Sequence, residues 1–186
     1  MATNQAYSKN NLVLQDELKI IEKAKLNHQF FAPIYNKYYD SIFRYIYKRV
    51  EEKEIAFDIT SCVFMKAMGA ISKFEFRGVP FSSWLFRIAK SELYQSFRDN
   101  KAKSSINIDS FQFIQVIEEF NHEQSEANYK RLMELLATLK KNELELIELR
   151  FFENRSFKEI GNILGITENN AKVKTFRALI KLRKKF

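Results

Sequence analysis

The segment from Lys172 to Phe186 carries the densest set of side chains that could bind a polyanion. It holds seven basic residues and no acidic one (Lys172, Lys174, Arg177, Lys181, Arg183, Lys184 and Lys185). A cationic block of this kind attracts phosphate groups, which dominate the affinity of proteins for nucleic acid. The segment is therefore a candidate nucleic-acid-binding element.

A second segment, "SKFEFRGVPFSSWLFRIAKSELYQSFRDN", alternates aromatic rings with cations. Rings can stack on unpaired bases while neighbouring cations hold the phosphates. At helical spacing such rings are usually core, and Trp84 and Tyr94 are expected to face inward in part. Gly78 and Pro80 interrupt the helical pattern, so Phe81 is expected in a loop beside a basic edge, where its ring could stack on a base.

Catalytic and metal chemistry find little support. His28 and His122 lie far apart in the sequence, and the single cysteine, Cys62, has no partner at ligand spacing. There is no phosphate-cradling glycine loop and no nucleophile motif. We expect neither an active site, nor a metal ion, nor a cofactor.

Two helices are predicted to position the basic block. Ser156 and Glu159 form a capping-box pattern that predicts a helix start at Phe157. Gly161 lies on the apolar face of this helix and would let another backbone approach closely. Gly165 can adopt a positive φ and so end the helix in a sharp turn.

The second helix is predicted to begin after Thr167, a favourable N-cap residue. Its inward line consists of Ala171, Thr175, Ala178 and Leu182. Two helices joined by a glycine turn form a helix-turn-helix, whose second helix can enter a major groove. The same pattern also occurs in helical bundles that bind no DNA, and the basic block favours the DNA-binding interpretation.

The whole chain is basic and rich in helix-period patterns. Its 186 residues carry a net charge of +8, and only four are glycine and two proline, so we expect an all-α protein. A single cysteine is typical of a reducing compartment. No apolar run of membrane-spanning length and no signal-peptide pattern is evident, so a cytoplasmic protein without membrane insertion is predicted.

The charge distribution divides the chain into two helical modules joined by a linker. Residues 1–24 are expected to form a tail or first helix, 25–99 the first module, 100–125 the linker and 126–186 the helix-turn-helix module. Residues 1–99 carry fifteen basic and eleven acidic side chains, residues 126–186 fourteen and eight, and the linker has a charge of −2. A short ordered piece is expected around 111–120 within the linker.

The order of three stretches resembles a bacterial sigma factor of the sigma-70 family. The stretches are "FDITSCVFMKAM", "FSSWLFRIAKSELYQSFRDN" and "ELELIELRFFENRSFKEIGNILGITENNAKVKTFRALIKL". The resemblance is to the extracytoplasmic-function (ECF) group, which retains only the two promoter-reading domains, and it spans about residues 25 to 184. It implies a subunit that binds core RNA polymerase, reads −35 and −10 promoter elements and promotes promoter opening, without catalysis of its own.

The resemblance implies three sets of site residues. The set for core polymerase is Asp58, Ser61, Cys62 and Met65, where the family generally has glutamine at the second position and an acidic residue at the third. The set for the melted −10 element is Phe76, Arg77, Phe81, Trp84, Arg87 and Ser91, the last in place of a frequent asparagine. The set for the −35 duplex is Asn169, Lys172, Val173, Lys174, Phe176 and Arg177.

Other partners and functions remain open at this point. The resemblance makes an anti-sigma factor a further candidate partner. A repressor or activator that binds only duplex DNA is the main alternative, and it would not need the aromatic–basic segment around Trp84. A nucleic-acid-processing enzyme is the third interpretation, and no carboxylate or metal cluster supports it.

Overall fold

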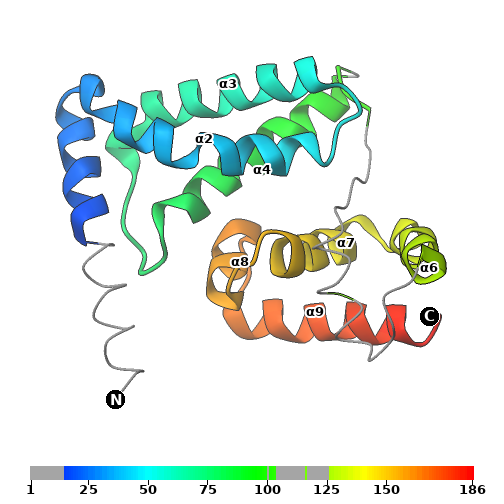
Figure 1. Ribbon diagram of the computed structural model, residues 1–186. Helices are drawn as coiled ribbons and strands as arrows, with labels where there is room; N and C mark the ends of the chain where they lie inside the picture. Colours follow the sequence, from blue (N-terminus) through cyan, green and yellow to red (C-terminus); the bar gives the residue numbers. More distant parts are fainter. Residues whose placement is uncertain (1–14, 100, 104–115, 117–125) are drawn as a thin grey trace. The chain divides into compact units, whose positions relative to one another are not determined.

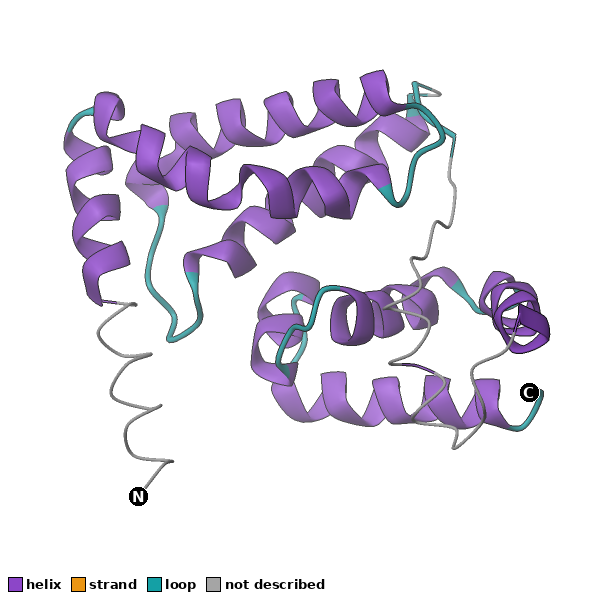
Figure 2. Ribbon diagram, in the orientation of Figure 1, coloured by secondary structure: helices purple, strands orange, loops and turns teal. Residues whose placement is uncertain are grey.

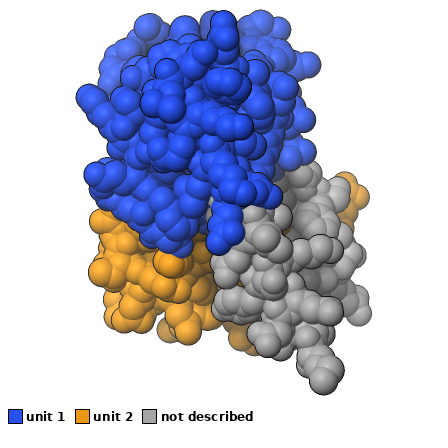
Figure 3. Space-filling model, turned by 90° about the vertical axis from the view of Figure 1, so that its left-hand side faces the viewer, with its two compact units in different colours: residues 1–103 blue, residues 104–186 orange. Residues whose placement is uncertain are grey.

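The computed structural model describes residues 15–99, 101–103, 116 and 126–186. Every regular element in these residues is a helix; Figure 1 labels the α-helices from α2 to α9, and Figure 2 distinguishes helices from loops. The chain divides into two compact units, residues 1–103 and 104–186, which Figure 3 colours separately. The prediction of an all-α chain with two helical domains is confirmed. The ordered piece predicted around 111–120 lies outside the described residues, apart from Val116.

The first unit is built around three long helices. A helix over residues 15–26 precedes η1 (His28–Phe31), α2 (Ala32–Tyr47), α3 (Lys53–Ala70), η2 (Ile71–Lys73) and α4 (Phe81–Arg98). Helix α3 packs against both α2 and α4. The largest fully buried side chains are Ile21, Ile42, Tyr45, Ile46, Ile71, Phe81, Leu85, Phe86 and Leu93.

Helix α3 is more apolar than the sequence patterns indicated. With the turn after it, residues 53–73, it is long and apolar enough to span a membrane by length and composition alone. A core helix passes the same test, and α3 buries Ala56, Ile59, Val63 and Ala67 along one side. The spacing of these residues places them on one helical face, which packs into the first unit.

The second unit contains α6 (Glu126–Ala137), α7 (Lys141–Ile147), η3 (Glu148–Phe152), α8 (Phe157–Leu164) and α9 (Glu168–Arg183). Element η3 is a π-helical turn, in which the Glu153 N–H donates to the Glu148 carbonyl over 2.9 Å. Asn154 follows in the left-handed region with φ 50° and turns the chain toward α8. Helices α7 and α8 both pack on α9, and the core includes Val116, Leu132, Leu136, Ile147 and Leu182.

The local signals at the helix-turn-helix are confirmed. The Ser156 N–H donates to the Glu159 carboxylate over 2.9 Å, and the Glu159 N–H donates to Ser156 Oγ over 3.2 Å. Gly165 has φ 70° at the end of α8. The Asn170 N–H donates to Thr167 Oγ1 over 3.2 Å, so Thr167 caps α9.

We predict that Gly161→Ala lowers the free energy of unfolding of the second unit. A Cβ at residue 161 would lie 2.7 Å from the Ile166 carbonyl oxygen and 3.2 Å from the Glu168 nitrogen, and both are backbone atoms. Overpacking of this kind typically costs about 1–3 kcal/mol. Urea unfolding of the full chain, with hydrogen exchange of the α8 and α9 amides, measures the change.

The matched control is Gly69→Ala in α3, where an added Cβ meets nothing within 4 Å. Replacing a glycine in the last turn of α3 should leave stability unchanged or raise it by up to about 1 kcal/mol. Equal effects of the two substitutions would contradict a close approach at Gly161.

Candidate functional site

The four residues predicted to contact polymerase line one groove. The groove has a volume of about 620 Å³ and runs between α3 and the C-terminal half of α4. Asp58, Ser61, Cys62 and Met65 form its α3 side, and Glu92, Gln95 and Asp99 are among the residues on its α4 side. The sequence spacing identified the α3 face, whereas the α4 side depends on a tertiary contact that local spacing does not reveal.

The carboxylates that line this groove differ in whether they already have an ion-pair or hydrogen-bond partner. The Glu92 carboxylate is paired with Lys66 Nζ at 2.7 Å, and the Asp99 carboxylate accepts a hydrogen bond from Gln95 Nε2 over 2.7 Å. Within the described residues, Asp58 is exposed and has no hydrogen-bond or ion-pair partner. Met65 is 60% exposed beside it. The groove therefore presents an apolar surface and one carboxylate that has no ion-pair or hydrogen-bond partner among the described residues.

The loop between η2 and α4 projects two side chains away from the core. Phe74 and Val79 are buried and anchor the loop, while Gly78 has φ 70° and turns the chain between them. Phe76 is 45% exposed, and Arg77 is also exposed. The loop therefore presents an aromatic ring next to a cation.

The structure corrects the assignment of Phe81 as a stacking ring. Phe81 is the first residue of α4 rather than a loop residue, and its side chain is only 1% exposed. Its ring packs against Phe74 and Trp84, with centroids 4.8 and 5.2 Å away. Because neighbouring rings cover it, Phe81 has no free face for a base. Pro80 is the N-cap residue of α4, so the helix already includes Phe81, which the sequence had placed in the loop.

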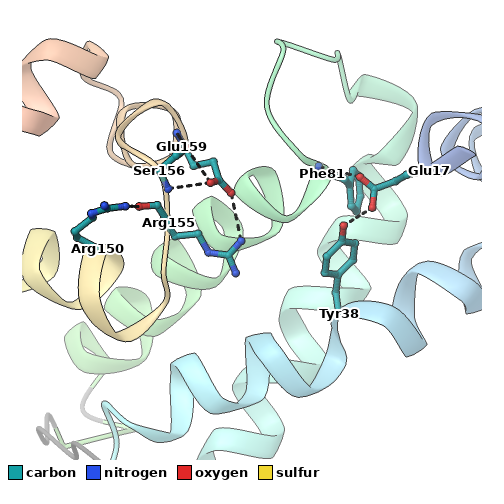
Figure 4. A network of polar contacts seen from close by, with 7 residues as sticks. All are labelled: Glu17, Tyr38, Phe81, Arg150, Arg155, Ser156 and Glu159. Atoms are coloured by element: carbon teal, nitrogen blue, oxygen red, sulfur yellow. Dashed lines mark hydrogen bonds and ion pairs between the residues drawn. The ribbon is translucent and has the colours of Figure 1, made fainter. Parts of the chain in front are cut away.

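A buried carboxylate that the sequence did not single out closes the start of α4. Glu17 is 7% exposed and accepts hydrogen bonds from the Tyr38 hydroxyl and, over 3.3 Å, from the Phe81 N–H (Figure 4). It also accepts a hydrogen bond from Lys37 Nζ over 2.7 Å. Helix α4 has no side-chain cap of its own. Glu17 satisfies one of its free N–H groups and places negative charge at the positive end of its dipole.

Three other predicted residues lie along α4 itself. Trp84 is half-buried, and Arg87 and Ser91 are exposed. Their spacing of three and four residues places them on one side of the helix. The Trp84 ring also lies 5.5 Å from that of Phe74, at the base of the loop that carries Phe76. The structure therefore keeps five of the six predicted residues accessible, and Phe81 is the exception.

Helix α9 separates its buried and exposed faces as predicted. Ala171, Thr175, Ala178 and Leu182 are buried. The six residues predicted for the −35 duplex are all exposed: Asn169, Lys172, Val173, Lys174, Phe176 and Arg177. Since each residue advances the helix by about 100°, Lys172 and Lys174 lie on opposite shoulders of the exposed face. Lys172 and Lys174 therefore flank the middle of the exposed face, one on each side.

Lys181 has a different role from the cations around it. Its Nζ lies 2.7 Å from the Glu143 carboxylate and so links α9 to α7. The hydrogen bond from Lys181, followed by one from the Lys140 backbone, lowers the pKa of Glu143. Arg183, Lys184 and Lys185 are exposed basic side chains that lie beyond the exposed face formed by Asn169 to Arg177.

The described residues contain no cluster of three or more His, Cys, Asp or Glu side chains that could hold a metal ion. The geometry consists of an apolar groove with an exposed carboxylate, an aromatic–basic loop and a helix-turn-helix with a basic exposed face. These features define the class of two-module all-helical proteins whose second module is a helix-turn-helix.

Comparison with known proteins assigns both modules to one family. Residues 34–103 match the model for sigma-70 region 2, and residues 135–184 match the model for sigma-70 region 4. The chain is 26% identical over 165 residues to the ECF RNA polymerase sigma factor BldN of Streptomyces coelicolor, covering 87% of this chain and 62% of BldN. It is 27% identical over 154 residues to the ECF RNA polymerase sigma factor SigM of Bacillus subtilis, covering 81% of this chain and 91% of SigM.

Two solved structures share the fold. CnrH, in complex with the cytosolic domain of CnrY, has a TM-score of 0.62 and 18% identity over 89% of this chain and 94% of its own. The sigma factor RpoE from Bartonella quintana, in complex with the anti-sigma factor NepR, has a TM-score of 0.59 and 18% identity over 83% of this chain and 94% of its own. The chain belongs to the sigma-70 family, as an ECF sigma factor.

Proposed function

We propose that this protein binds core RNA polymerase, directs it to promoters by reading their −35 and −10 elements, and promotes promoter opening. The observation that carries this proposal is the presence, in one chain and in this order, of a region 2 match over 34–103 and a region 4 match over 135–184. The protein would act where polymerase acts, in the cytoplasm, and would perform no catalysis itself.

We assign a binding partner to each of the three surfaces. The groove residues Asp58, Ser61, Cys62 and Met65 would contact polymerase. Phe76 and Arg77, with Trp84, Arg87 and Ser91 on α4, would hold the melted −10 strand, because exposed rings and cations suit unpaired bases and their phosphates. The exposed face of α9 would enter the −35 major groove, as the second helix of a helix-turn-helix can.

Further partners follow by analogy. The solved structure of RpoE is a complex with an anti-sigma factor, and we include an anti-sigma factor among the candidate partners of this chain. The domain boundaries we propose place polymerase and −10 binding in residues 25–99 and −35 binding in residues 126–186.

The experiment that tests the proposal is transcription with purified components. Core RNA polymerase supplemented with the full chain should start transcripts at defined positions on genomic DNA fragments, and core polymerase alone should not. A chain that binds duplex DNA but never supports a defined start would instead be a duplex-binding repressor or activator.

We predict that substitutions within the exposed face of α9 (Asn169 to Arg177) and substitutions beyond it affect −35 binding in different ways. Lys172→Ala and Arg177→Ala should each remove a contact to a base edge or groove, costing about 1–3 kcal/mol and relaxing selectivity. Lys184→Ala should weaken binding about equally on all sequences and reduce the salt slope by about one, because it removes a phosphate contact. Binding titrations on a duplex panel at several salt concentrations measure both effects. Unchanged selectivity in all three variants would mean that α9 is not the recognition helix.

A further inference from the structure

The exposed face of α9 contains an apolar ridge in the middle of its basic residues. Val173 is 39% exposed, Phe176 46% and Ile180 54%. Their spacing of three and four residues places them on one stripe, together with Asn169 and Arg177. Electrostatic attraction to phosphate does not require apolar side chains at the centre of the face. The ridge therefore indicates contact with an apolar group on the ligand.

The ring of Phe176 packs against the ring of Phe157, which in turn contacts Arg150. Phe157, the first residue of α8, lies with its ring centroid 6.1 Å from that of Phe176 at an interplanar angle of 41°. The Arg150 guanidinium, from the π-helical turn η3, lies 5.0 Å from the Phe157 centroid. Arg150 Nη1 also donates to the Arg155 carbonyl over 3.1 Å, as Figure 4 shows. This stack restricts the ring of Phe176 while leaving almost half of it exposed.

We propose that Val173 and Phe176 read the 5-methyl groups of thymines in the −35 duplex, with Phe157 and Arg150 as positioning residues. In the major groove, the thymine methyl is the apolar group on the base edges, and valine or phenylalanine side chains can pack against it. Val173 and Phe176 are separated by about 4.5 Å along the helix axis, close to the rise of about 3.4 Å between bases along one strand. The two side chains therefore suit thymines of neighbouring base pairs.

This inference rests on the proposed function, since it assigns a base to a helix proposed to enter the −35 duplex. It adds a contact that distinguishes thymine from the other bases, which attraction between charges alone does not do. Lys174 on a shoulder of the face, and Lys184 beyond it, can hold phosphates of any sequence. Contact with a methyl group makes selectivity depend on thymine at the bases facing the ridge.

The experiment replaces thymine with uracil, which keeps every hydrogen-bonding group and lacks only the methyl. The full chain, with core RNA polymerase present, first selects sites from a random duplex pool, and each thymine of the selected −35 site is then replaced singly. Losing one buried methyl-sized contact should weaken wild-type binding about fourfold. Phe176→Ala and Val173→Ala should each bind the thymine and uracil duplexes equally at one position.

Leu26→Ala is the matched control, because Leu26 is an apolar side chain that is 90% exposed in the first unit, outside α9. It should keep the full thymine preference. Phe157→Ala should lose the preference at the position assigned to Phe176, and Phe157→Tyr should keep it. Arg150→Gln should reduce the same preference while leaving the Phe157 ring in place, which tests positioning even if Phe157→Ala does not fold.

Two results distinguish failure of this inference from failure of the proposed function. A selected site at which wild-type protein tolerates uracil at every position would overturn the thymine assignment alone. Equal loss of preference in Leu26→Ala and Phe176→Ala would also overturn it. A pool in which no sequence is enriched would overturn −35 recognition, and the thymine assignment with it.

Discussion

Asp58→Lys is expected to remove most binding to core RNA polymerase. Asp58 is exposed in the groove between α3 and α4, and within the described residues its carboxylate has no ion-pair or hydrogen-bond partner. A cation of the partner can therefore approach it without displacing a contact within the protein. Disrupting a desolvated charge pair at an interface costs about 2–5 kcal/mol. Titration of labelled protein with core polymerase measures the affinity.

The matched control for this substitution is Asp40→Lys. Asp40 is an exposed acid on α2 and does not line the groove, so its reversal changes the net charge by the same amount. Asp40→Lys should retain wild-type affinity, and circular dichroism should give the same helical content for both variants. Equal affinity of Asp58→Lys and wild type would mean that polymerase docks elsewhere.

Phe76→Ala is expected to impair promoter melting without changing the fold. The ring is 45% exposed on a loop whose anchors, Phe74 and Val79, are buried. Loss of a base-stacking ring costs about 1–3 kcal/mol per base, and only unpaired bases offer a free face. Permanganate reactivity of −10 thymines with polymerase present should therefore fall, while −35 duplex binding stays unchanged.

Phe30→Ala provides the control, because Phe30 is 48% exposed on η1, outside the loop. It should leave melting unchanged. Phe81→Ala should instead unfold or loosen the first unit, since truncating a buried phenylalanine typically costs about 3–5 kcal/mol. Normal melting by Phe76→Ala would remove the proposed role of the loop in base capture.

The sequence predicted the helix-turn-helix accurately because its determinants are local. Ser156 and Glu159 are three residues apart, and the turn at Gly165 depends on a single backbone angle. The buried line of α9 also follows from helical periodicity alone. Local spacing therefore predicted both the element and the side chains that it exposes.

The aromatic segment was harder to predict because burial there depends on distant residues. Phe76 and Phe81 lie on either side of Gly78 and Pro80, and no local sequence pattern indicates which of the two rings is buried. The difference arises from contacts such as that between the rings of Tyr38 and Phe81, which are 43 residues apart in sequence and have centroids 6.2 Å apart. The support of Phe176 by Phe157 and Arg150 is likewise a tertiary arrangement.

Glu17 also bears on where this protein can be divided or recombined with its relatives. The region 2 match begins at residue 34, whereas the carboxylate that closes α4 comes from the helix over residues 15–26. Ile21 and Ala24 of that helix are fully buried as well. A fragment or chimera that starts at the matched boundary would lose the closure of α4 and part of the core beneath it. The transferable module therefore begins before Glu17, upstream of the family match.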